Sequence, residues 1–204
     1  MFQTDRFKSI RMARPKAYDR KKVVDDATQL FWQKGYHGTS LSELVSVTGL
    51  NKHSMYKEFG SKAGLFNECL ENYGLKVTLE LSKILTKKPL GLGNIRAFFE
   101  NRIEYICSDE FKGCLVVKST VEKELLEVSA VELLKVHSKL FEDALGDCLR
   151  AAIEAEELPA TADPELLTQY LVRFIAGMLV MGEPKNGEAE ARKLVDMVLA
   201  GLKT

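Results

Sequence analysis

The sequence predicts an all-α protein, and three observations lead to that prediction. Every long segment repeats its apolar residues with a helical period, and none alternates apolar and polar residues as a half-buried strand does. Glycine and small polar residues stand where these segments begin and end, as helix caps do. The 204 residues, 46% of them hydrophobic, suffice for the core of one large domain or two small ones.

The first two helices have clear ends. Asp19 is a candidate N-cap for the first, and Gly35 ends it. Ser40 opens the second, because Glu43 three residues later completes a capping box. Gly49 is able to adopt the left-handed turn that ends this short helix.

The third helix is also short, and the fourth is long. Asn51 caps the third, whose Met55 and Phe59 point inward, and Gly60 ends it before Ser61 caps the fourth. The apolar face of the fourth helix consists of Phe66, Cys69, Leu70, Tyr73, Val77, Leu81 and Ile84.

Five more helices are expected along the rest of the chain, near residues 93–107, 114–126, 130–156, 164–182 and 188–202. Ser129 and Glu132 form a second candidate capping box, and Asp163 precedes a first-turn proline, Pro164.

Several classes of function are not indicated. The longest uncharged apolar run, residues 174–182, is far shorter than the ~20 residues of a membrane span. Basic residues at the N-terminus are not followed by the apolar block of a secretion signal, so we expect a cytoplasmic protein. The four cysteines are widely spaced, and no HExxH or GxSxG motif occurs. We therefore expect reduced thiols, mostly in the core, with no metal, no cofactor and no enzymatic activity.

The charge is unevenly distributed although the net charge of the chain is zero. Residues 1–62 contain twelve Lys/Arg and six Asp/Glu, a net charge of +6, and the remaining residues carry −6. A basic end on an acidic body indicates a polyanionic partner for that end, and a solvated charge run is the alternative.

Two short helices joined by residues 49–51 predict a helix-turn-helix. The first helix of such a pair fixes the angle of the second, which presents its outer face to the DNA major groove. Cations, a phenol and small donors suit phosphates and base edges. The outward residues of the second helix are Lys52, His53, Ser54, Tyr56 and Lys57.

The same region resembles a known family. Residues 30–66 read LFWQKGYHGTSLSELVSVTGLNKHSMYKEFGSKAGLF, which is similar to the N-terminal domain of the TetR/AcrR bacterial repressors. The match covers roughly residues 20–67, about a quarter of the chain. The helical remainder fits as well, because members of that family carry a divergent ligand-binding and dimerisation domain there. The resemblance thus implies a helix-turn-helix domain over residues 19–66 and a second domain over residues 67–204.

The resemblance also implies which residues contact DNA. Thr39 and Ser40 match a TS pair whose hydroxyls approach a phosphate at a helix N-terminus. Residues 52–54 match the variable positions that reach bases. The implied DNA-contacting set is Thr39, Ser40, Lys52, His53, Ser54, Tyr56, Lys57 and Lys62.

Glu58 differs from the family pattern, and the residues before the matched region need a separate interpretation. Glu58 stands where the family often has histidine; it either pairs with a nearby lysine, which we favour, or accepts a hydrogen bond from cytosine. MARPKAYD, from Met12, resembles a typical start for the family, so residues 1–11 are interpreted as an upstream extension. Within residues 1–18, Arg14 and Lys16 then either form a basic arm that reaches the DNA or are disordered.

The C-terminal helices contain candidate ligand contacts. Arg102 interrupts an apolar stripe that includes Phe98, and a buried arginine needs a partner. Arg102 either meets an anionic ligand or, as we favour, forms an internal ion pair or extends its charged end to the solvent. His137 shares a face with Phe141 and is interpreted as a core histidine ahead of a ligand contact.

KGCLVVKST, residues 112–120, resembles a segment in a subset of the family, some of whose members respond to oxidants or electrophiles through cysteine. Near Lys112 and Lys118, Cys114 would be favoured as a reactive thiolate. Simple packing of Cys114 is the alternative, and we favour a pocket for a small hydrophobic ligand over thiol sensing. The candidate ligand set is Phe98, Arg102, Cys114, Lys118, His137 and Phe141.

The last two helices indicate self-association. Residues 164–182 are apolar nearly all round and, with the stripe on residues 188–202, predict a homodimer interface through residues 164–202. Two-fold symmetry would place two recognition helices on a palindromic operator. We therefore expect a dimeric regulator of double-stranded DNA, a repressor released by a small-molecule effector. Thiol sensing and a helical binding module without DNA are the alternatives.

Overall fold

The computed structural model describes residues 18–182 and 187–203. These residues form nine α-helices and one 3-10 helix and contain no strand, which confirms the all-α prediction. The predicted basic arm with Arg14 and Lys16, and the proposed extension of residues 1–11, lie outside the described residues. The helices are α1 (Arg20–Lys34), α2 (Leu41–Thr48), α3 (Lys52–Phe59), α4 (Lys62–Leu85), α5 (Leu92–Ile106), α6 (Leu115–Val121), α7 (Val128–Glu154), α8 (Pro164–Met181) and α9 (Glu188–Gly201).

The predicted caps of the first helices are present. The Asp19 carboxylate accepts hydrogen bonds from the backbone N–H groups of Lys21 and Lys22, at 2.9 and 3.3 Å. Ser40 and Glu43 form the capping box of α2. Asn51 accepts from the Ser54 N–H at 2.9 Å.

The turn between α2 and α3 is tight because Gly49 adopts the left-handed conformation, with φ of 65°. Leu50, the next residue, is buried. The two helices are therefore held at a fixed angle by sequence features that act within a few residues.

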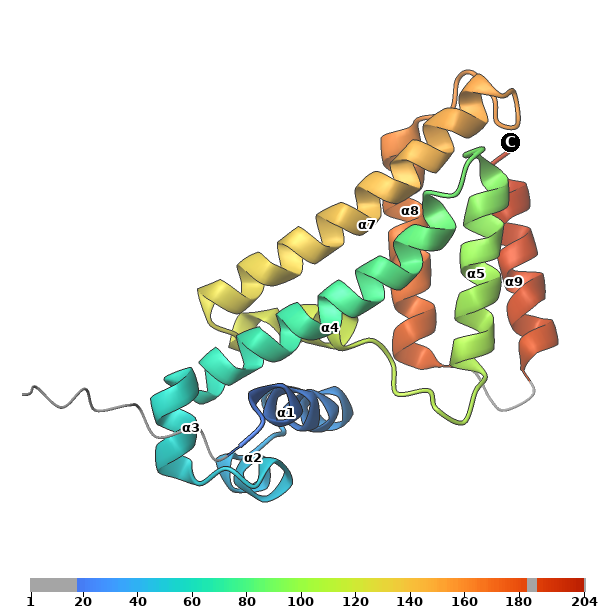
Figure 1. Ribbon diagram of the computed structural model, residues 1–204. Coiled ribbons are helices and arrows are strands. Elements are labelled where there is room, and N and C mark those ends of the chain that lie inside the picture. Colours follow the sequence, from blue (N-terminus) through green and yellow to red (C-terminus); the bar gives the residue numbers. More distant parts are fainter. Residues whose placement is uncertain (1–17, 183–186, 204) are drawn as a thin grey trace, which may run out of the picture.

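Helices α1, α2 and α3 pack around the first part of α4 and form a small unit, which we call the reader. In Figure 1 the reader lies at the lower left, below the long diagonal of α4. Its centre is aromatic: the rings of Phe31 and Phe66 meet edge to face with centroids 4.9 Å apart. Met55 and Phe59 anchor α3 to this core, as predicted.

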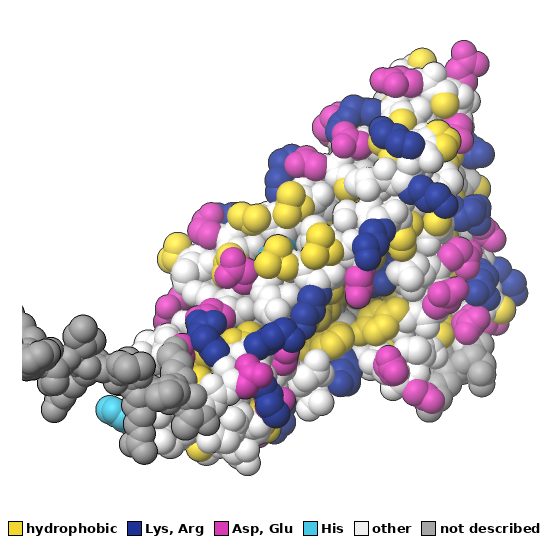
Figure 2. Space-filling model, in the orientation of Figure 1, with side chains coloured by type: hydrophobic (Ala, Val, Ile, Leu, Met, Phe, Trp, Pro, Cys, Tyr) yellow, Lys and Arg dark blue, Asp and Glu magenta, His cyan; other side chains and the backbone are white. Residues whose placement is uncertain are grey.

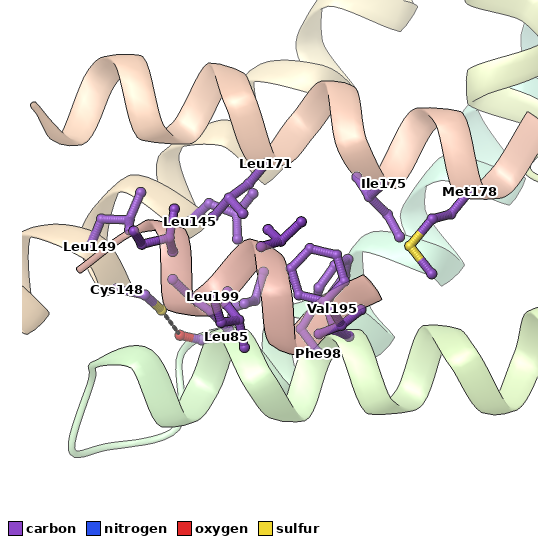
Figure 3. Packing of buried hydrophobic residues seen from close by; sticks show 14 of the residues in the cluster. Leu85, Phe98, Leu145, Cys148, Leu149, Leu171, Ile175, Met178, Val195 and Leu199 are labelled. Carbon is purple, nitrogen blue, oxygen red and sulfur yellow. Dashed lines mark hydrogen bonds between the residues drawn. The ribbon is translucent and has the colours of Figure 1, made fainter. Parts of the chain in front are cut away.

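The rest of the chain forms a second unit, which we call the sensor. Helices α4 and α7 run side by side in the same direction, α5 and α8 pack against them, and α9 packs on the outer side of α5 (Figure 1). Buried side chains from these helices converge in one core, where Phe98, Leu171 and Val195 lie together (Figure 3). The Cys148 thiol donates to the Leu85 carbonyl oxygen at 3.0 Å, so this cysteine belongs to the core as expected.

Two local predictions were wrong. The capping box of Ser129 and Glu132 does not exist, because α7 begins earlier, at Val128 after Glu127, and the Ser129 hydroxyl accepts a hydrogen bond from Asn67 at 2.8 Å. The helix predicted over 114–126 is also interrupted. It ends at Val121, and a separate 3-10 turn follows over Lys123–Leu125.

Candidate functional site

The outer face of α3 is the first candidate site. Lys52, His53, Tyr56 and Lys57 are exposed, Ser54 is half-buried, and the 43% exposure of Tyr56 leaves part of its ring accessible. The structure thus brings the predicted recognition residues together on one side of an eight-residue helix. The side facing inward is apolar, because Met55 and Phe59 occupy it.

Ion pairs in the reader neutralise its negative charges. Glu58 pairs with Arg20 at 2.8 Å and accepts a hydrogen bond from the Tyr18 hydroxyl at 2.7 Å. The prediction that Glu58 pairs with a cationic side chain is confirmed, although the partner is an arginine of α1 rather than a lysine. Three further carboxylates of α1 and α2, Asp25, Asp26 and Glu43, pair with lysines.

Lys52 and Lys57, by contrast, form no ion pair in the described part of the chain. The Lys52 ammonium lies 5.9 Å from the centre of the Tyr56 ring, on the outer face of α3. The positive charge of this face is therefore available to a polyanion.

The remaining predicted DNA contacts differ among themselves. Ser40 is exposed at the N-terminus of α2. Thr39 is only 1% exposed and its hydroxyl donates to the Gly35 carbonyl oxygen at 2.7 Å. The Lys62 ammonium lies 4.4 Å from the centre of the Tyr36 ring, and burial lowers the pKa of Lys62. Thr39 is thus built into the reader, whereas Ser40 and Lys62 lie at its border.

A cavity of about 280 Å³ within the sensor is the second candidate site. Its walls come from α4, α5, α6, α7 and α8 and are mostly apolar. Five of the six residues predicted to bind a ligand line it: Phe98, Arg102, Cys114, His137 and Phe141.

Lys118 is the exception among the six. Its ammonium donates to the Trp32 carbonyl oxygen at 3.0 Å, and its side chain does not line the cavity. Lys112 likewise turns toward α1, where it donates to Gln29 at 3.2 Å. Both ammonium groups are therefore directed to acceptors on α1. Arg102 is a further cation that interacts electrostatically with Cys114.

Arg102 lies in the wall of the cavity without a carboxylate. In the described part of the chain it forms no ion pair, and its Nε atom is buried without a hydrogen-bond partner. Burial lowers the pKa of Arg102, because desolvation penalises the charged guanidinium. The internal ion pair, one of the two alternatives to a ligand that the sequence favoured, is therefore not formed in the described part of the chain.

His137 is also unpartnered in the described structure. Its ring is 8% exposed and packs against Gly74, and neither ring nitrogen has a hydrogen-bond partner. Burial lowers the pKa of His137, which keeps the imidazole neutral near pH 7. The expected core position of His137 is confirmed.

Sequence reasoning missed the contacts that join the two units. The Trp32 indole N–H donates to the Gly113 carbonyl oxygen at 2.9 Å, and the Tyr36 N–H donates to the Glu122 carboxylate at 3.1 Å. Gly113 and Glu122 bracket α6, and α6 lines the cavity with Val116, Val117 and Thr120. No local motif marks these pairs, because they join residues more than eighty positions apart.

Other chemistry is not seen in the described residues. No group of histidine, cysteine and carboxylate side chains suitable for a metal ion occurs there, and all four cysteines are free thiols. None of the helices described has the length and apolar character needed to cross a bilayer.

Two groups of exposed apolar residues lie on the helices of the sensor. One group follows α4 and α7 and includes Leu75, Leu79, Val136 and Leu140; Figure 2 shows hydrophobic side chains along this middle band. The other group lies on α8 and α9 and consists of Leu166, Tyr170, Val180, Met181, Leu194 and Met197. Such patches are typical of interaction surfaces.

Comparison with known proteins gives two family matches. The sequence model described as "Bacterial regulatory proteins, tetR family" matches residues 23–69, and that described as "Tetracyclin repressor-like, C-terminal domain" matches residues 91–195. Together the matches cover the reader and most of the sensor.

Individual relatives agree with these matches. The chain is 28% identical to the HTH-type transcriptional repressor ComR of Escherichia coli (strain K12) over 169 residues, which is 82% of this chain and 80% of ComR. It is similar to a solved cysteine mutant of the TetR family regulator CifR in complex with 26-base-pair operator DNA, at 26% identity and a TM-score of 0.75, covering 92% of this chain and 98% of CifR. The reduced form of E. coli NemR shares the fold, with 21% identity, a TM-score of 0.73 and coverage of 90% and 94%.

Proposed function

The chain belongs to the tetR family of bacterial regulatory proteins. From this membership we propose that it is a transcriptional repressor whose affinity for DNA is controlled by a small molecule bound in the sensor cavity. The observation that carries the proposal is the exposed face of α3, where Lys52 and Lys57 have no acidic partner in the described structure. The solved relative CifR is a complex with operator DNA.

In this proposal residues 19–66 read the DNA and residues 67–204 sense the effector. Lys52, His53 and Ser54 face the base edges, Tyr56 and Lys57 lie beside them, and Ser40 and Lys62 contact the backbone. Thr39 is assigned a positioning role, since its hydroxyl is already bonded to the Gly35 carbonyl. Lys118 is not included among the effector contacts.

The operator is proposed to be a palindrome read by a homodimer. The exposed apolar side chains of α8 and α9, within residues 164–202, would be covered by the same surface of a second copy. A two-fold axis would then set two α3 helices into successive major grooves, about one helical turn apart. The exposed side chains Tyr170, Met181 and Met197 support this use of the surface.

Coupling between the sites is proposed to run through α6. An effector in the cavity touches Val116 and Val117. The ends of the same segment bind the reader, since Gly113 accepts from Trp32 of α1 and Glu122 accepts from Tyr36 in the loop after α1. A displacement of α6 would change the position of the reader relative to its dimer partner. Moving the operator from nearly full to nearly no occupancy requires ~5.5 kcal/mol of differential affinity of the effector for the two states.

The proposal includes no enzymatic activity and no cofactor, and it places the protein in the cytoplasm with the DNA. The polar groups of the described cavity do not include a nucleophile with an adjacent base, which acid–base or covalent catalysis would need. The relatives with assigned roles are transcriptional regulators.

The experiment that tests the proposal is selection of random DNA duplexes by the purified protein at near-physiological salt, followed by sequencing. A palindrome with half-sites about one turn apart, bound by two protomers, is the expected result. A Lys52→Ala, Lys57→Ala double variant should not enrich the motif, whereas Lys139→Ala, an exposed lysine on α7, should behave as the parent. Uniform binding to any duplex would argue for a module without sequence recognition.

Thiol sensing through Cys114 is the second candidate. Cys114 is a free thiol that lines the cavity, so its sulfur is a candidate for addition to an electrophile that enters the cavity. In this version a compound such as N-ethylmaleimide should release the operator from the parent. Cys114→Ser should retain full operator affinity and no longer respond. A persistent response in that variant would exclude Cys114 as the sensor.

A further inference from the structure

We propose that the sensor cavity takes an organic anion, a small molecule with an apolar body and one anionic head that pairs with Arg102. This inference deepens the proposed function and rests on it, because it assigns a chemical class to the effector. It follows from the charges, the unused hydrogen-bond donors and the apolar walls of the cavity.

The first step is the charge of the walls. Among the described residues that line the cavity, Arg102 is the single permanently charged one, and no aspartate, glutamate or lysine accompanies it. The two phenols cannot balance it, because burial raises the pKa of Tyr73 and of Tyr105 and keeps both neutral. The wall of the cavity therefore has a positive charge, and Glu80, the carboxylate that acts on Arg102 from outside the wall, forms no ion pair with it.

The second step is the geometry of the guanidinium. Its Nη2 group donates to the neutral side chain of Asn101, and its central carbon lies 5.5 Å from the centre of the Tyr105 ring. Its Nε–H is buried and has no acceptor. A guanidinium presents its five donors as a planar fork that suits the two oxygens of a carboxylate.

The phenol beside Arg102 is not a competing acceptor. The Tyr105 hydroxyl donates to the Gly113 carbonyl oxygen at 2.9 Å and receives a hydrogen bond from the Lys112 N–H at 3.3 Å. Tyr105 therefore packs against one side of the guanidinium and, as a neutral phenol, does not neutralise its charge.

The third step is the remainder of the cavity. Phe98 and Phe141 lie with ring centroids 5.2 Å apart, and Leu81, Val117 and Leu179 complete a wall without charge. The neutral polar groups without a hydrogen-bond partner in these described walls are the hydroxyls of Thr78 and Ser138 and the buried ring nitrogens of His137. A mainly apolar body matches these walls, whereas a cationic molecule would add a second unpaired positive charge.

The class is testable with ligands that differ only in the head group. We would titrate the parent with octanoate, octanol and octylammonium, and with 3-phenylpropionate, 3-phenylpropanol and 3-phenylpropylammonium. Calorimetry measures the binding, and the fluorescence of the single tryptophan, Trp32, reports on the junction between reader and sensor. At pH 7 we expect an acid to bind at least about tenfold more tightly than its alcohol, and the ammonium not to bind.

Substitutions of Arg102 test whether this side chain causes the preference for an acid over its alcohol. Arg102→Gln should retain affinity for the alcohol and lose the preference for the acid, whereas Arg102→Lys should retain part of it. Arg96→Gln is the matched control, because Arg96 lies on the same helix but is exposed and pairs with Asp196 at 2.6 Å. If Arg102→Gln does not fold, Arg102→Lys still tests the role of Arg102. This variant lacks the planar guanidinium, so its preference for the acid over the alcohol should be smaller than that of the parent.

Equal affinities for acid and alcohol, tightest binding of the ammonium, or binding of none of the six ligands would each overturn the assignment. These outcomes are independent of the proposed repressor activity, which is measured separately by operator binding of the same preparation. If the protein binds its operator but none of the acids, the proposal of an anionic effector is wrong and the repressor proposal stands. If it binds the acids but no operator, the repressor proposal is wrong and the anion-binding cavity stands.

Discussion

The reader and the sensor both contain positive charge, but they place it in opposite surroundings. On α3 the cations are exposed and the neighbouring carboxylates are held by other residues, as Glu58 is by Arg20. In the sensor a single guanidinium lies in an apolar wall without a carboxylate in the described structure. The first arrangement costs little in folding, since the lysines stay hydrated, whereas the second costs desolvation that only a partner offsets.

This difference separates two kinds of recognition. Exposed lysines attract a large polyanion over a distance, and their effect weakens with salt because counterions are released on binding. A buried arginine is screened little by salt and is reached only by a molecule small enough to enter the cavity. The predictions below test the two regions against each other, beginning with the largest effect.

The two cores should respond separately to deletion of an aromatic ring. Phe31→Ala removes a fully buried ring from the reader and Phe99→Ala one from the sensor, and each should lower the free energy of unfolding by about 3–5 kcal/mol. Hydrogen exchange should accelerate in α2 and α3 for the first variant and in α5 and α8 for the second. Equal acceleration throughout the chain in both variants would mean that the units unfold together.

The exposed lysines should account for the salt dependence of operator binding. Replacing Lys52 and Lys57 together by alanine should weaken operator binding by about 1–3 kcal/mol, and the slope of log K against log salt should fall by about one for each phosphate that these lysines neutralise. Binding is measured by fluorescence anisotropy at several salt concentrations. Lys139→Ala should leave both quantities unchanged, since Lys139 lies in the sensor and pairs with Asp143.

Arg102 should destabilise the protein when no ligand is present. Arg102→Met, which keeps the apolar contacts of the side chain, should raise the free energy of unfolding by about 1 kcal/mol, because a half-buried charge without an ion-pair partner is removed. Urea denaturation of ligand-free protein measures the change. Arg96→Met should stay within about 0.5 kcal/mol of the parent, as expected of an exposed pair. A decrease in stability in Arg102→Met would mean that the guanidinium has an internal partner.

The smallest effect concerns the capping box of α2. The Lys34 ammonium and the Ser40 hydroxyl hold the pKa of Glu43 at about 2, below the 4.5 of an unperturbed glutamate. A depressed folded-state pKa stabilises the protein above pH 4.5 and loses that contribution as the pH falls toward 2. Glu43→Gln should therefore lower Tm at about pH 6, and the difference from the parent should shrink as the pH is lowered to about 3. A difference that is constant with pH would contradict this origin.

Much of the reader was predictable from the sequence. Asp19, Ser40, Asn51 and Ser61 cap the helices at the predicted positions, and Gly49 makes the predicted left-handed turn. These features act over three or four residues, so a local pattern contains all the information they need. The prediction of a capping box at Ser129 failed although Ser129 and Glu132 have the required spacing, because α7 begins earlier, at Val128. A local pattern alone therefore does not fix where a helix starts.

The sensor was predictable only in part. Helical period placed Phe98, Arg102 and Phe141 on inward stripes, and all three line the cavity. The direction of Lys118 was not predictable, because its ammonium reaches the carbonyl of Trp32, a residue 86 positions away in the sequence. Nor did any pattern reveal that α6 stops at Val121, next to the glutamate that binds the Tyr36 N–H.

The sequence by itself determined the helices, their ends, the outward face of α3 and the resemblance to a family of DNA-binding regulators. The tertiary structure alone decided that Glu58 pairs with Arg20, that Lys118 turns toward α1, and that Arg102 lies in a cavity without a carboxylate among the described residues. The physical reason is distance along the chain. Caps and periodicity arise among neighbours, whereas the charge that surrounds a buried side chain depends on helices that meet only after folding.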